Sequence, residues 1–108
     1  MLRSLLACAF LVCSTSVLAQ SVDIPAELWD RPRTARAILE HENVRRVINL
    51  GLEKPDAQIV IHHASGQEPL LQAEELKSWL TALAIDSRRV ALRADAAAGS
   101  PMRLEIVQ

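Results

Sequence analysis

The 108-residue sequence has no tyrosine, one phenylalanine and two tryptophans, so aromatic side chains are scarce. Proteins that bind single-stranded nucleic acid stack the bases on aromatic side chains, and this chain has too few aromatic residues for such a surface. The charges are nearly balanced, with 12 basic and 13 acidic residues. A nucleic-acid-binding face needs a basic excess, so the composition argues against nucleic acid as a partner.

The sequence has two cysteines, Cys8 and Cys13, and both lie in an apolar run near the N-terminus. A positive charge at Arg3 precedes this run, and small and polar residues follow it as far as Ala19. A charged start, a short apolar core and a small-x-Ala step are the parts of a secretory signal. The run is too short to span a bilayer, which needs about 20 residues. We therefore predict a signal peptide over residues 1–19, cleaved after Ala19, and a periplasmic protein.

The chain that remains after this cleavage lacks cysteine, so a disulfide framework is excluded. Its length, roughly 90 residues, suits one domain. It has no second long apolar run, so we expect no transmembrane anchor. Residues 20–33 are polar, contain Pro25 and Pro32, and are expected to form an extended arm that docks through Trp29. The domain is expected to occupy residues 34–108.

Hydrophobic spacing predicts the order helix, strand, helix, strand, strand after the arm. Asn43 is the expected N-cap of the first helix, and Pro55 should end it. Residues 34–39 fit a helix or a strand, and either they or residues 22–24 could add a further strand. The predicted elements are a helix over 43–53, a strand over 57–62, a helix over 69–84, and strands over 90–93 and 102–107.

A helix between the first two strands makes them parallel, with a right-handed crossover. The last two strands are expected to pair as a hairpin. The fold class is therefore α/β, as a small α+β sandwich whose mixed sheet carries helices mainly on one face.

The segment from Ile59 to Val90 carries a pattern of spaced apolar residues on a helix, a turn, and a basic residue that opens the next strand. In this pattern it resembles the peptidoglycan-associating domain of the OmpA-like family. The resemblance implies that fold and a place in the cell envelope. The residues that carry the pattern are Ala73, Leu76, Leu80, Ala84-Ile85 and Arg89-Val90.

The OmpA-like family holds the diaminopimelate of the cell wall with an aspartate in the loop after the strand and an arginine on the helix. Here the strand continues into His62-His63-Ala64-Ser65-Gly66, and Gln72 stands at the arginine position. A neutral amide cannot supply the bidentate ionic contact that an arginine gives a carboxylate. The resemblance therefore implies the fold more than the ligand, and another envelope protein is a better expected partner than peptidoglycan.

His62 and His63 are the most noticeable polar pair, but neighbours on a strand point to opposite faces. We expect one half-buried and one exposed histidine, and no metal or cofactor. No nucleophile–base pair or paired carboxylates are visible, so the prediction is a non-enzymatic periplasmic accessory or interaction protein. The alternative is a small-ligand or metal-binding module that uses the histidines. The candidate binding residues are His62, His63, Gln67, Glu68, Gln72 and Arg88.

Overall fold

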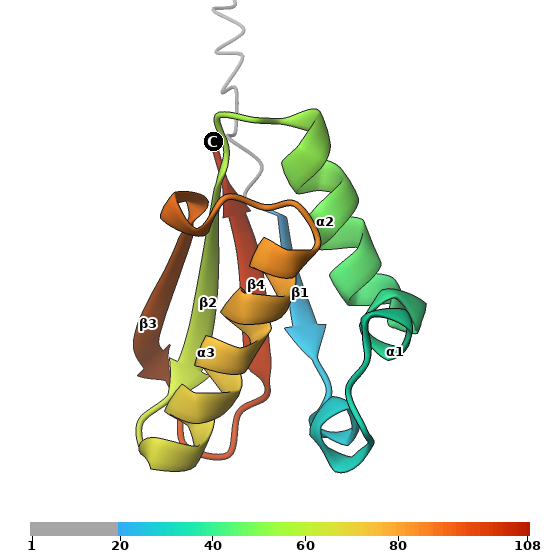
Figure 1. The fold of residues 1–108 in the computed structure, drawn as a ribbon. Coiled ribbons are helices and arrows are strands. Elements are labelled where there is room, and N and C mark those ends of the chain that lie inside the picture. The colour runs from blue at the N-terminus through green and yellow to red at the C-terminus, as the bar shows by residue number, and fades with distance from the viewer. Residues whose placement is uncertain (1–19) are drawn as a thin grey trace, which may run out of the picture.

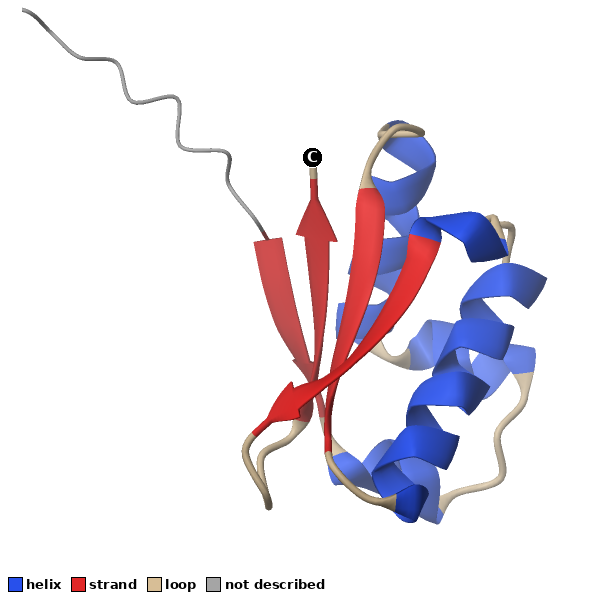
Figure 2. Cartoon of the chain, turned by 90° about the vertical axis from the view of Figure 1, so that its left-hand side faces the viewer, coloured by secondary structure: helices blue, strands red, loops and turns tan. Residues whose placement is uncertain are grey.

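The computed structural model describes residues 20–108, and the predicted signal peptide lies outside them. In the described part, four strands form one mixed sheet, and the helices lie on one of its faces (Figures 1 and 2). The predicted fold class is therefore confirmed. The elements are β1 (Gln20–Ile24), the 3-10 helix η1 (Ala26–Asp30), α1 (Ala35–Glu40), α2 (Glu42–Glu53), β2 (Gln58–Ala64), α3 (Gln67–Ala82), the 3-10 helix η2 (Ser87–Arg89), β3 (Val90–Ala96) and β4 (Met102–Val107).

The strand order is β1-β4-β2-β3, which confirms one expected pairing and corrects another. β2 and β3 are parallel, as predicted. The predicted hairpin of β3 with β4 is wrong, because β4 lies between β1 and β2 and is antiparallel to both. Burial explains this order. β4 buries Met102, Leu104 and Ile106 on one face, whereas β3 is largely exposed and stays at the edge.

The segment 20–33 belongs to the sheet and the core. An extended arm was expected, with residues 22–24 as a possible further strand, and these residues do form part of a strand. The first five residues of the segment form β1, in which Val22 lies opposite Leu104 of β4. Ile24 is buried in the core, and Trp29 of η1 packs against the core, as predicted. Only the stretch after η1 runs over the surface without regular structure.

Polar side chains near the starts of α1 and α2 form hydrogen bonds whose partners the sequence does not fully predict. Residues 34–39, left open, lie mainly in α1, because the Thr34 hydroxyl accepts a hydrogen bond from the Ala37 amide (3.1 Å). Asn43 is not an N-cap, as α2 begins one residue earlier, at Glu42. Its side-chain amide instead donates to the Asp23 carbonyl (2.8 Å) and so ties α2 to β1.

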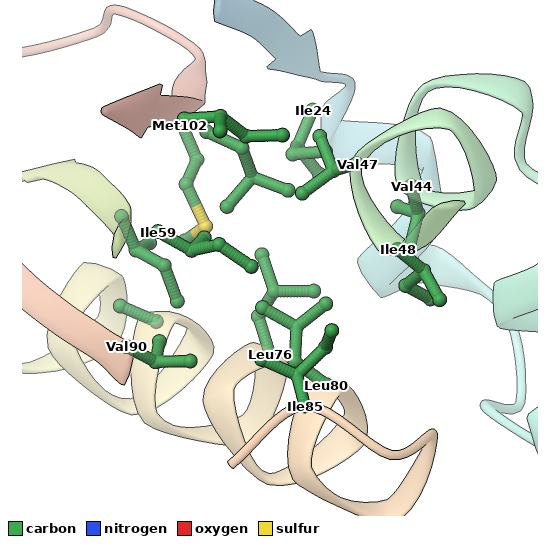
Figure 3. Packing of buried hydrophobic residues seen from close by; sticks show 14 of the residues in the cluster. Ile24, Val44, Val47, Ile48, Ile59, Leu76, Leu80, Ile85, Val90 and Met102 are labelled. Carbon is green, nitrogen blue, oxygen red and sulfur yellow. The ribbon is translucent and has the colours of Figure 1, made fainter. Parts of the chain in front are cut away.

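The core fills the space between the sheet and the helices (Figure 3). Val44, Val47 and Ile48 of α2 and Leu76 and Leu80 of α3 belong to one cluster with the inner residues of the strands. None of the helices between residues 20 and 108 has the length and apolar character needed to cross a bilayer.

The C-terminus of α3 contains a strained alanine. Ala84 has a φ of 84°, the left-handed region in which a β-carbon costs about 1 kcal/mol. The Ile85 amide donates to the Leu80 carbonyl (2.9 Å) and the Ala84 amide to the Thr81 carbonyl (3.2 Å). These two bonds form a Schellman motif, which favours glycine at the position of Ala84.

We therefore predict that Ala84→Gly raises the free energy of unfolding by about 0.5–1 kcal/mol, because the strain is removed. Ala82→Gly, two residues earlier at the last position of α3, is the control and should lower it by up to about 1 kcal/mol. Urea unfolding of the three proteins measures both effects. Equal destabilisation by the two glycines would contradict the assigned backbone conformation.

Candidate functional site

The sheet has one face without helices, shown on the left of Figure 2. Ile59 and Ile61 of β2 point to the core, so the alternating residues Val60 and His62 point to the other face. Strand pairing places polar residues of all four strands beside them. This uncovered sheet face consists of Ser21, Asp23, Gln58, Val60, His62, Ala91, Arg93, Asp95, Arg103, Glu105 and Val107.

Both histidines are buried, with 6% of His62 and 4% of His63 exposed, so the expectation of one half-buried and one exposed side chain is wrong. The reason is that β2 extends to Ala64 between two neighbouring strands, so neither histidine lies at a strand end. His63 faces the helices, and its Nδ1 donates to the carbonyl of Ala64 (2.8 Å). The two rings thus lie on opposite sides of the sheet.

His62 is held by acidic residues of two neighbouring strands. Its Nδ1 donates to Oδ1 of Asp95 on β3 at 2.7 Å, and its Nε2 lies 3.7 Å from Oε2 of Glu105 on β4. The same Glu105 oxygen lies 3.5 Å from Arg103 Nη1. The hydrogen bond from His62 is the main cause of a lowered pKa at Asp95, so this carboxylate is ionised at neutral pH.

This arrangement differs from that of a serine-type triad. In a serine-type triad the second ring nitrogen faces a nucleophile, whereas Nε2 of His62 is enclosed beside Glu105 without a hydrogen-bond partner. No described serine or threonine hydroxyl donates to the ring. Residues 20–108 also contain no cluster of three or more acidic, histidine or cysteine side chains that could hold a metal ion.

A hollow of about 380 Å³ opens on the uncovered sheet face beside His62. One wall is the loop between β3 and β4, and the floor comes from β2 and β4. Two carboxylates and one guanidinium face it, so the lining is charged with both signs. The lining residues are Asp23, His62, Asp95, Ala96, Ala97, Ser100, Pro101 and Arg103.

The other predicted binding residues do not gather at this hollow. Gln67 and Glu68 are exposed in the first turn of α3, and Gln72 is half-buried in the next turn. Arg88 lies on η2, beyond the other end of α3 (Figure 1). A helix of 16 residues spans about 24 Å, so Arg88 cannot share a small ligand with the residues at its start.

Arg88 instead belongs to a local turn. Its Nη2 donates to Asp86 Oδ2 at 2.8 Å and its Nε to Oδ1 at 3.2 Å. These hydrogen bonds lower the pKa of Asp86 to about 2. Gln72 lines a second, smaller hollow of about 170 Å³ with Trp29, Arg33, Leu71 and Glu75, where the Arg33 guanidinium stacks on the Trp29 ring and pairs with Glu75.

Sequence reasoning missed Asp23, Asp95, Arg103 and Glu105 as site residues. Alternation along residues 102–107 did place Arg103 and Glu105 on the face opposite the core. The incorrect hairpin hid their proximity to His62, because it paired β4 with β3 instead of β2. The predicted strand ends at residue 93, whereas Asp95 still lies in β3, next to an irregularity in the pairing with β2.

We predict that Asp95→Asn destabilises the protein at neutral pH and has a diminishing effect in acid. The lowered pKa means that the fold stabilises the ionised carboxylate. This contribution is fully present above the ordinary value of 3.8 and is lost as the pH falls through the lower folded-state value. Melting temperatures of both proteins should therefore converge on acidification. A difference independent of pH would contradict the ionic role, and Asp56→Asn serves as an exposed control.

Comparisons with protein-family models, with curated proteins and with solved structures gave no match.

Proposed function

We propose that this chain is an exported, non-enzymatic accessory protein of the bacterial cell envelope that binds a partner protein with its uncovered sheet face. The single observation that carries the binding role is the one-sided sheet, whose free face gathers charged side chains around a hollow. Export rests on the signal-like residues 1–19, and the envelope on the resemblance of Ile59–Val90 to the OmpA-like family.

The character of this face supports a protein partner. The face carries charges of both signs and has an open hollow, so a complementary protein surface can be oriented on it. The residues that the family uses against diaminopimelate are replaced here, which makes peptidoglycan a weaker candidate. The non-enzymatic role is supported by the enclosed Nε2 of His62.

Reversing two charges of the uncovered sheet face tests the proposal. The doubly substituted protein Asp23→Lys, Arg103→Glu should lose at least about tenfold in affinity for its envelope partner, because like charges then meet across the interface. The matched control is Glu42→Lys, Arg46→Glu, which reverses an ion pair on α2 (3.5 Å) and should leave binding unchanged. Quantitative co-purification from periplasmic extract, followed by titration with the identified partner, measures the affinity of both variants for that partner.

Melting curves separate lost binding from lost folding. Unchanged binding by the folded sheet-face variant would contradict the proposal, as would equal loss in the helix-face control. The same preparation tests export, because the periplasmic protein should begin at Gln20.

A further inference from the structure

The hollow on the uncovered sheet face contains two acidic side chains with unused hydrogen-bonding capacity. Among the described residues, no side chain pairs with the Asp23 carboxylate, which lies exposed on β1. Asp95 uses Oδ1 for His62, and half of its side chain (52%) remains exposed. Both carboxylates are therefore open to a group that enters the hollow.

Arg103 and His62, which line the hollow, each have an acidic partner, and the charge of Arg93 on the same face helps to lower the pKa of Asp95. Arg103 pairs with Glu105, which does not line the hollow. His62 donates to Asp95 and lies with its side chain only 8% exposed, so its role is to hold that carboxylate in place. Its Nε2 is buried without a hydrogen-bond partner and lies 3.7 Å from Oε2 of Glu105, so this atom is not open to a group in the hollow.

We propose that the hollow receives a basic side chain, arginine or lysine, from the partner protein, with its cationic head between Asp23 and Asp95. This inference rests on the proposed function and names the chemistry that the face recognises. The volume of the hollow fits one long side chain, because about 380 Å³ lies at the lower end of the range for small-ligand pockets. The small residues Ala96 and Ala97 and the ring of Pro101 line the hollow and offer apolar contact to the methylene stem.

A blocked arginine, N-acetyl-arginine amide, is the probe, and its neutral isostere N-acetyl-citrulline amide is the control ligand. Titration of the isotope-labelled protein followed by NMR should shift the amides of the β3–β4 loop with the arginine probe. We expect a dissociation constant of about 1 mM, as one ionic contact in an open hollow gives weak binding. The citrulline probe should produce no saturable shifts.

Two variants locate the binding. Asp23→Asn should weaken the arginine probe at least about fivefold, because it removes a charge without altering any hydrogen bond in the described residues. Asp95→Asn should weaken it similarly, whereas Glu74→Gln on the exposed side of α3 should not. Equal binding of arginine and citrulline, or an unchanged affinity in Asp23→Asn, would overturn the inference.

The outcome separates this inference from the proposed function. If the arginine probe does not bind but charge reversal on the uncovered sheet face still abolishes partner binding, the face is confirmed as the interface. The inference that a basic side chain enters the hollow is then wrong. If the probe binds and charge reversal has no effect on the partner, the hollow is a small-ligand site and the proposed function is wrong.

Discussion

Replacing Leu104 with alanine should lower the free energy of unfolding by about 3 kcal/mol. Leu104 is fully buried in β4, which lies between two other strands, so the surrounding side chains cannot close around the cavity. The matched variant is Leu92→Ala in β3. That side chain is only partly buried at the edge of the sheet, so its loss should cost about 1 kcal/mol.

Chemical unfolding of both variants tests the strand order itself. In the hairpin arrangement expected from the sequence, β3 would be the inner strand and β4 the edge. The cost of the two substitutions would then be reversed. A Leu92 variant less stable than the Leu104 variant would therefore contradict the order β1-β4-β2-β3.

Arg89→Met should lower the free energy of unfolding by about 3 kcal/mol. Its Nη2 donates to the carbonyls of Gly51 (2.8 Å) and Lys54 (2.7 Å), and its Nε donates to that of Ala57 (3.0 Å). The guanidinium thus joins the start of β3 to the end of α2 and the segment that enters β2. Hydrogen bonds from a charged donor contribute about 1.5–3 kcal/mol each, and partial exposure reduces their sum.

The neighbouring Arg88 provides the control for this prediction. Arg88→Met removes the same charge from the same turn, but its contacts reach only Asp86 at the surface. Surface ion pairs contribute little, so this substitution should cost much less stability than Arg89→Met. Similar melting temperatures for the two variants would show that the carbonyl contacts of Arg89 do not stabilise the fold.

Periodicity in the sequence was enough to predict the elements that pack by a simple repeat. The apolar stripe of α3, the β-branched run of β2 and the alternation of β4 each appear at the expected places. Their partners were harder to assign, because spacing along one strand does not say which strand lies beside it. The edge position of β3 depends on total burial across the sheet, which no local pattern contains.

The contacts of polar side chains were likewise hard to predict from a local pattern, because their partners lie far away in the sequence. Asn43 has the residue type of an N-cap, yet its amide bonds to the Asp23 carbonyl, a contact made 20 residues away. His62 is a noticeable residue in the sequence, but its partners Asp95 and Glu105 come from two other strands. The candidate site could be predicted from the sequence only in its central residue, since the rest depends on the strand order.

Site-specific photocrosslinking in intact cells is the most direct test of binding through the uncovered sheet face. A photoreactive amino acid at Ser21 or Ser100 lies on that face or at the rim of its hollow, whereas one at Glu74 or Ser78 lies on the exposed side of α3. We predict the same single envelope protein in the adducts from Ser21 and Ser100, and no adduct with it from Glu74 or Ser78. Adducts with a partner from the α3 positions alone would contradict the account.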